Sequence, residues 1–181
     1  MDELNRLLEG NKRYVSGKLA EKDVGSAREA SKESQKPFVT ILTCSDSRVV
    51  PEFIFDANVG ELFVIRNAGN VVDEIVLGTI EYGVEHLHTP LLLVLGHEKC
   101  GAVTAACSGG ECPANIAAIM SRIKPAKAKG GDVEQVILNN MDNVIEEIRA
   151  GSEIVRHLEK EGKLKIVGMK YFFEDGRAEV K

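Results

Sequence analysis

Four short apolar runs constrain the fold of this 181-residue chain more than any other feature. They occupy residues 38–43, 62–65, 91–95 and 164–167, and polar or turn residues bound each of them. Because their hydrophobicity is continuous and does not alternate, both faces of each strand should be covered. Strands of this kind are typical of a parallel sheet between layers of helices, so the sequence predicts an α/β fold.

Other segments carry helical periodicity or turn signals. Residues 71–87 place apolar side chains near a 3.6-residue period, which predicts a crossover helix between the second and third strands. Residues 132–160 predict two helices that are broken near Gly151, because Ser152 can cap the start of the second one. The basic stretch 122–131 is interpreted as a solvated loop, since charge runs usually lie in solvent.

The length and charge of the chain restrict its class. With 181 residues and 44% hydrophobic content, it can bury one sizeable core, which predicts a single domain over residues 1–181. The amino-terminal segment is amphipathic and unlike a signal peptide, and no apolar run is long enough to span a bilayer. The net charge of −5 argues against nucleic acid or anionic membranes as partners. We therefore expect a cytoplasmic protein whose partner is a small molecule or another protein.

Two clusters of metal-ligand side chains follow the first and third apolar runs. Cys44 and Asp46 follow the first run, and His97 and Cys100 follow the third. In an open α/β sheet, ligands collect beyond the carboxyl ends of the strands, so two distant stretches could converge on one ion. Two thiols, an imidazole and a carboxylate are donors that Zn²⁺ prefers. The sequence therefore predicts one zinc ion per chain at this edge of the sheet.

Each of these residues also has a simpler interpretation when it is taken alone. Cys44 and Cys100 could be buried small hydrophobic residues, and His97 could be a hydrogen-bonded turn residue. The matched positions of the two clusters at strand ends favour a metal site instead. Cys107 and Cys112 have no second His or Cys cluster beside them and are interpreted as structural.

Four motifs occur in order along the chain: C-S-D-S-R-V at residues 44–49, R-N-A-G-N at 66–70, E-Y at 81–82 and G-H-x-x-C-G-A at 96–102. Their order and spacing resemble those of the β-class carbonic anhydrases. The resemblance implies a lyase, a carbonate dehydratase, that interconverts carbon dioxide and bicarbonate. It also implies a mostly parallel sheet of four strands plus an edge strand, flanking helices and an amino-terminal helical arm. The implied assembly is a homodimer, or a larger even-numbered oligomer, with active sites at the subunit interface.

The resemblance further implies a role for each matched residue. Cys44, His97 and Cys100 would hold zinc permanently, and Asp46 and Arg48 would form a catalytic dyad. Zinc-bound hydroxide would attack carbon dioxide. Substrate-binding roles are implied for five more positions: Gln35, Phe63, Ala68, Tyr82 and Gly101.

The donor set explains why such a site would need the dyad. Two thiolates cancel the charge of the ion, so water on it should be less acidic than water at a site with three histidines. Asp46, held by Arg48, could accept the hydrogen of the nucleophile and orient it. Asp46 could also leave Arg48 and take the fourth position on zinc, which suggests a pH-dependent or ligand-dependent switch.

Two other classes of function stay open. One is a non-enzymatic zinc protein with a closed, four-ligand site, which the pairing of Asp46 with Arg48 disfavours. The other is a hydrolase of a related linear substrate such as carbonyl sulfide, which the set of Gln35, Phe63 and Tyr82 disfavours. A nucleotide-binding module is excluded because no phosphate-binding glycine motif follows a strand.

Overall fold

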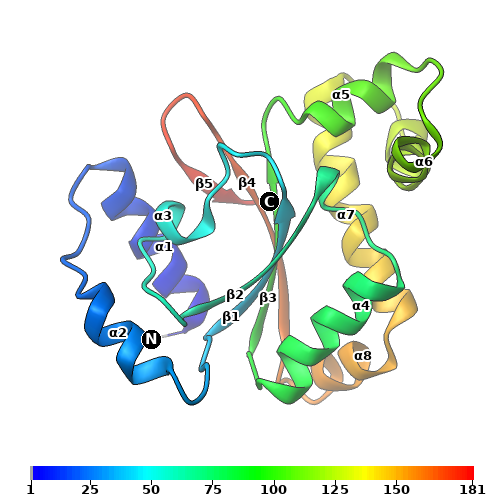
Figure 1. The fold of residues 1–181 in the computed structure, drawn as a ribbon. Helices are drawn as coiled ribbons and strands as arrows, with labels where there is room; N and C mark the ends of the chain where they lie inside the picture. The colour runs from blue at the N-terminus through cyan, green and yellow to red at the C-terminus, as the bar shows by residue number, and fades with distance from the viewer. Residues whose placement is uncertain (1) are drawn as a thin grey trace.

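The computed structural model describes residues 2–181 and centres on a five-stranded sheet (Figure 1). Strands β1 (Val39–Cys44), β2 (Leu62–Asn67), β3 (Leu91–His97) and β4 (Lys165–Tyr171) run parallel. Strand β5 (Ala178–Val180) pairs with β4 in the antiparallel direction. The strand order is β2-β1-β3-β4-β5, so the predicted parallel sheet with an added edge strand is confirmed.

Burial differs between the central and the outer strands. Every residue of β1 and β3 is buried, as the continuous apolar runs predict. Strand β2 forms one edge of the sheet and β4 lies next to the short β5, and both carry partly exposed side chains. The prediction that all four strands are covered on both faces was therefore wrong for β2 and β4, because helices cover the middle of the sheet more fully than its margins.

Helices form a layer on each side of the sheet (Figure 1). Helices α1 (Glu3–Val15) and α3 (Pro51–Ile54) contribute to the core on one face. Helices α4 (Glu74–Glu81), α7 (Val133–Gly151) and α8 (Glu153–Lys160) contribute to the core on the other. No helix within residues 2–181 is long and apolar enough to cross a membrane.

Strand β3 connects the two cores. Leu91, Leu93 and Leu95 belong to the core beneath α1 and α3, whereas Leu92 and Val94 belong to the core beneath α4 and α7. All five side chains are at most 2% exposed. Burying a side chain of this kind contributes about 1.5–3 kcal/mol, so the strand that ends in the site is firmly held.

The predicted crossover helix over 71–87 is present but begins later. Helix α4 starts at Glu74 because the Asp73 side chain caps it, accepting a 2.8 Å hydrogen bond from the backbone N–H of Val76. A π-helical turn, Tyr82–His86, continues it. The predicted break after α7 is confirmed, with the Ser152 side chain capping α8.

The interpretation of residues 122–131 as a loop was wrong for most of that stretch. Helix α6 spans Ala114–Ala128, and its Ile123 and Ala126 are fully buried against α5 (Gly101–Ser108) and α7. The lysines occupy the remaining surface of the helix. Burial of a small apolar face therefore outweighs the solvation preference of the charged residues around it.

The predicted amino-terminal helical arm is confirmed as α1 followed by α2 (Val24–Ser31). The buried Asn11 side chain fixes α1, since it donates to the carbonyls of Ile54 and Gly176 and accepts from the backbone N–H of Ala178. Gly10 allows the close approach, because a Cβ atom there would lie 1.9 Å from the carbonyl oxygen of Phe55.

Candidate metal centre

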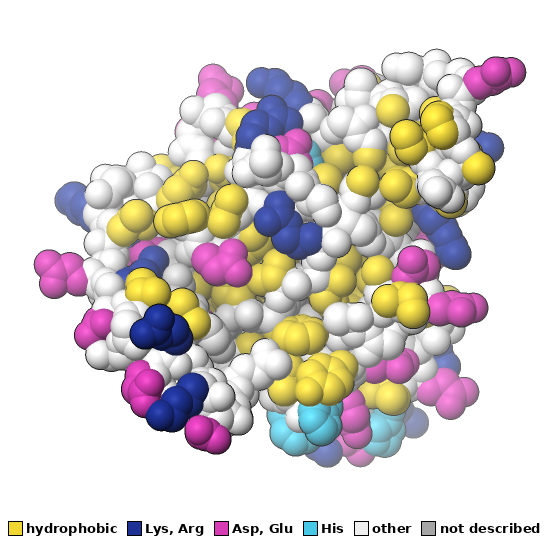
Figure 2. All heavy atoms as spheres, viewed as in Figure 1, with side chains coloured by type: hydrophobic (Ala, Val, Ile, Leu, Met, Phe, Trp, Pro, Cys, Tyr) yellow, Lys and Arg dark blue, Asp and Glu magenta, His cyan; other side chains and the backbone are white. Residues whose placement is uncertain are grey.

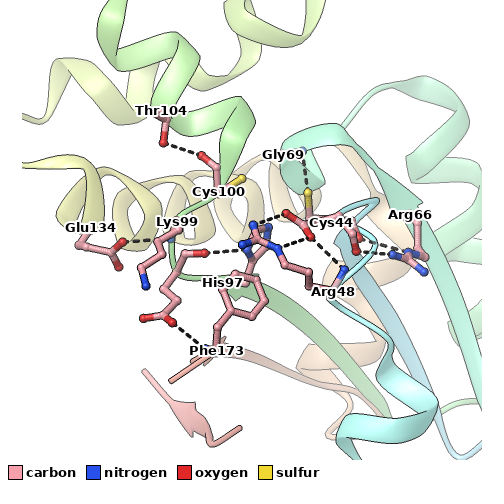
Figure 3. Close-up of polar contacts among 12 residues, drawn as sticks. Cys44, Arg48, Arg66, Gly69, His97, Lys99, Cys100, Thr104, Glu134 and Phe173 are labelled. Atoms are coloured by element: carbon pink, nitrogen blue, oxygen red, sulfur yellow. Dashed lines mark hydrogen bonds and ion pairs between the residues drawn. The ribbon is translucent and has the colours of Figure 1, made fainter. Parts of the chain in front are cut away.

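Cys44, His97 and Cys100 converge at the carboxyl ends of the central strands (Figure 3). Cys44 ends β1, His97 ends β3 and Cys100 is the N-cap of α5. Because β1 and β3 are parallel neighbours, their carboxyl ends meet. The three ligand atoms lie within 4.8 Å of one another and all three residues are buried. No other group of this kind occurs among residues 2–181.

The His97 ring is oriented to bind a metal. Its Nδ1 lies 2.8 Å from the carbonyl oxygen of Glu98, and a carbonyl can only accept a hydrogen bond, so Nδ1 carries the hydrogen. Nε2 then holds a bare lone pair, and it is buried without a hydrogen-bond partner. An unsatisfied buried acceptor is unfavourable by about 1–3 kcal/mol, which a metal ion at Nε2 would relieve.

The two thiols behave as a coupled pair. Cys100 lowers the pKa of Cys44 by donating a hydrogen bond, and the backbone N–H of Gly69 lowers it further. The Gly69 N–H lies 3.4 Å from the Cys44 sulfur. Cys44 and burial together raise the pKa of Cys100, because a second thiolate beside the first is unfavourable. A divalent cation would remove that conflict, so two sulfurs and one nitrogen fit zinc.

Asp46 and Arg48 form an ion pair beside this group. The Arg48 Nε and Nη2 atoms donate to the two carboxylate oxygens of Asp46 at 2.9 and 2.8 Å. The backbone N–H of Arg48 donates to Oδ1 at 3.0 Å. Arg48 thereby holds the pKa of Asp46 well below its usual range. Asp46 is thus an ionised carboxylate engaged with Arg48 and lies outside the three-residue group.

Hydrogen bonds from two different elements hold the turn between His97 and Cys100. Lys99 has a positive φ of 53°, and its backbone N–H donates to the Glu134 carboxylate at 3.1 Å. The Glu98 carboxylate accepts from the backbone N–H groups of Phe173 and Glu174, beyond the end of β4. These contacts over-determine a backbone conformation that non-glycine residues seldom adopt.

Two of the predicted substrate-binding residues border the site. Ala68 begins the short 3-10 turn Ala68–Asn70, which carries the Gly69 N–H to the Cys44 sulfur. Gly101 directly follows Cys100 and starts α5, where a backbone N–H has no partner within the helix. Both residues are exposed.

The other three predicted substrate-binding residues lie elsewhere in the chain. Phe63 is paired with Thr40 near the amino ends of β2 and β1, and its ring is 5.9 Å from that of Tyr82. Gln35 is exposed and precedes β1. Five residue steps at about 3.3 Å separate the first residue of β1 from Cys44, or about 16 Å. A single chain therefore does not bring Gln35, Phe63 or Tyr82 to the metal ligands.

Several residues beside Cys44, His97 and Cys100 are not predicted by the sequence motifs. Glu98 lies between two named motif residues, and its isolated charge gave no signal. Phe173 comes from the turn after β4, and its ring centroid lies 5.4 Å from that of His97. Gly69 leaves a usable signal, because a glycine within the motif at residues 66–70 favours a tight turn, and its φ in the structure is 77°.

Comparisons with known proteins return one family. A family model described as carbonic anhydrase matches residues 39–178. A carbonic anhydrase from Mycolicibacterium smegmatis is 36% identical over 97% of this chain and 90% of its own length. Carbonic anhydrase 2 from Mycobacterium tuberculosis is 37% identical over 95% of this chain and 88% of its own. The solved β-carbonic anhydrase of Coccomyxa, in complex with acetazolamide, has a TM-score of 0.78 and 28% identity, covering 99% of this chain and 86% of its own.

Proposed function

The chain belongs to the β-class carbonic anhydrase family, a family of lyases, and from that premise we propose that it hydrates carbon dioxide reversibly with one bound zinc ion. The observation that carries the proposal is the buried group of Cys44, His97 and Cys100 beside an ionised Asp46. The products are bicarbonate and a proton.

The three residues of the group would hold the ion. His97 presents the Nε2 lone pair because its Nδ1 is engaged with Glu98. Cys44 and Cys100 would bind as thiolates, and the Gly69 N–H helps to hold the charge on Cys44. When bound, zinc lowers the pKa of a coordinated water molecule and so supplies a nucleophile near neutral pH.

Asp46 is proposed to orient that nucleophile. Its Oδ1 already accepts two hydrogen bonds from Arg48, whereas Oδ2 accepts only one and keeps a free acceptor position. Oδ2 can therefore accept the hydrogen of the attacking group and direct its lone pair toward the carbon of carbon dioxide. The N–H of Gly101 is proposed to donate to the oxygen on which negative charge develops.

A non-enzymatic site would use Asp46 differently. A closed structural site needs a fourth protein ligand, and Asp46 is the nearest candidate in sequence. In the structure both of its oxygens accept hydrogen bonds from Arg48, which favours a metal site whose fourth coordination position is open. The proposed switch, in which Asp46 exchanges Arg48 for the metal, stays a hypothesis that zinc-site structures at low and high pH would test.

A second copy of the chain is proposed to complete the pocket. Gln35, Phe63 and Tyr82 lie toward the amino ends of the strands, far from their own chain's ligands. Apolar side chains are exposed across the face that contains β2 and the amino-terminal helices (Figure 2). Phe53 is 59% exposed and Tyr82 is 46% exposed. A homodimer would cover such residues and could carry the three distant side chains into the partner's site.

Mixing two inactive variants tests this arrangement. In a heterodimer of Gln35→Ala and Asp46→Ala, the first chain keeps its own Asp46 and would receive an intact Gln35 from its partner. Random mixing should then restore about a quarter of wild-type turnover, because half of the dimers carry one intact site of two. If Gln35 served its own chain, no mixed dimer would contain an intact site and turnover would stay at the level of the separate variants.

Stopped-flow hydration of carbon dioxide tests the activity itself. Zinc-loaded protein should turn over carbon dioxide at a rate that rises from pH 6.5 to 9, and chelator-stripped protein should not. Carbonyl sulfide serves as the comparison substrate. Tightly held zinc without turnover of carbon dioxide would overturn the proposal, and turnover of carbonyl sulfide alone would identify the hydrolase.

A further inference from the structure

We infer that Phe173 is a positioning residue that keeps Arg48 in place to hold Asp46. This inference rests on the proposed function and adds a residue outside all four sequence motifs. Phe173 lies in the turn between β4 and β5, more than 70 residues away in sequence from His97 (Figure 3).

The ring of Phe173 contacts both halves of the site. The Arg48 guanidinium carbon lies 4.0 Å above the ring centroid, which is cation–π geometry. The ring centroids of Phe173 and His97 are 5.4 Å apart, with a tilt of 53°. One aromatic side chain therefore borders the metal-ligand group and the partner of Asp46 at once.

Phe173 is itself held in place. Its backbone N–H donates to the Glu98 carboxylate at 2.6 Å, and its ring packs edge-on against the buried Tyr171 at 5.4 Å. Because Glu98 follows His97 directly, the turn after β4 is attached to the same loop that carries the metal ligands. The ring is thus a fixed surface and not a mobile contact.

Arg48 needs such a surface. Its side chain is 52% exposed, and a half-exposed arginine has many competing orientations in water. The ring restricts the guanidinium to a plane in which Nε and Nη2 both face the carboxylate of Asp46. Loss of a contact of this strength corresponds to about a two- to fivefold change in the population of the paired state.

The turn provides a matched control. Phe172 precedes Phe173 directly, yet its ring faces other cations. The Lys170 Nζ atom lies 4.9 Å from the ring centroid and the Arg177 guanidinium carbon lies 5.8 Å from it. Phe172→Leu therefore removes from the same turn an aromatic ring that lies against Lys170 and Arg177 and not against Arg48 or His97. Phe173→Tyr keeps the ring, whereas Phe173→Leu and Phe173→Met both remove it.

The test compares these variants of the zinc-loaded protein by NMR and kinetics. In both ring-free variants, the Arg48 Nε–H signal should exchange with water about two- to fivefold faster, and kcat should fall by a similar factor at unchanged KM. Zinc content should stay equal. Phe173→Tyr should restore both values, and Phe172→Leu should change neither.

The role of Phe173 and the carbon dioxide hydration activity can be refuted independently. Unchanged Arg48 exchange in both ring-free variants overturns the role of Phe173, whatever the activity. Equal losses in Phe172→Leu and Phe173→Leu would also overturn it, because the effect would then belong to the turn. Absence of carbon dioxide hydration in the wild-type protein would defeat the proposed function, while the exchange of Arg48 would still report on the contact.

Discussion

Asp56 fastens the amino-terminal arm to the body of the protein, and Asp56→Asn should lower the free energy of unfolding by about 2 kcal/mol. Its carboxylate is fully buried. Arg13 Nε and Lys22 Nζ lie 2.5 Å from its two oxygens, and the Ala20 N–H donates at 3.0 Å. All three partners belong to the arm, which leads through α2 to Gln35. Asn is the matched replacement, because residue 56 has a positive φ of 48° that Asn also adopts.

The magnitude follows from the ionisation of Asp56. Burial raises its pKa, but hydrogen bonds from Lys22 and Arg13 outweigh burial and lower the pKa from 3.8 to about 2. At about 1.4 kcal/mol per unit, this shift corresponds to about 2 kcal/mol of stability. Because the folded-state pKa is the lower one, the stabilisation is fully present above the unfolded pKa. It is lost as the pH falls through the folded value.

Urea unfolding at pH 7 and pH 3 measures the effect. The difference between wild type and Asp56→Asn should be about 2 kcal/mol at pH 7 and about half of that at pH 3. Glu9→Gln is the control, since Glu9 pairs with Lys12 on the exposed surface of α1 and should leave the midpoint unchanged. A difference of the same size at both pH values would refute the assignment of the stability to the charge of Asp56.

Three further substitutions test the site and the arm, and a fourth serves as a control. Cys100→Ser should lower bound zinc measured after dialysis against a chelator, because a hydroxyl is a poor zinc ligand. Asp46→Ala should keep zinc and lower kcat by about 10²–10³-fold in stopped-flow assays. Retained activity would contradict its proposed role, and loss of zinc would make Asp46 a permanent ligand. Gly10→Ala should lower the melting temperature, because the new Cβ would lie 1.9 Å from the Phe55 carbonyl oxygen. Gly78→Ala on α4 is the control. Its new Cβ would meet no atom within 4 Å, so this substitution should be neutral or stabilising.

The convergence of Cys44, His97 and Cys100 could be predicted because it depends on few physical rules. Continuous apolar runs identify buried parallel strands, and the carboxyl ends of such strands lie on one edge of the sheet. Cys44 and His97 each end such a strand, so their convergence required only that β1 and β3 be neighbours. The pairing of Asp46 with Arg48 was equally local, since the two residues share one turn.

Contacts that depend on the packing of distant elements could not be predicted in this way. Phe173 reaches the site because Glu98 attaches the turn after β4 to the loop that follows β3 and because its ring packs on Tyr171. The helical state of residues 122–128 depends on α5 and α7, which bury Ile123 and Ala126. Phe173 leaves no trace of its contact in the sequence, whereas Ile116, Ile119, Met120 and Ile123 do stand at helical spacing. The helix itself could therefore have been predicted, but its packing against α5 and α7 could not.

The sheet also explains why one chain cannot form the whole proposed pocket. Ligands for an ion collect at the carboxyl ends, whereas Phe63 and Thr40 are paired near the amino ends of β2 and β1. Thr40, the partner of Phe63, is four residue steps from Cys44, or about 13 Å along a rigid strand, so no rotamer change can bring Phe63 to Cys44. Motion within one chain therefore cannot bring these side chains to Cys44, and the proposed pocket needs a second copy. For this reason, substitutions at Gln35, Phe63 or Tyr82 should impair turnover while leaving zinc bound, whereas substitutions at Cys44 or His97 should impair both.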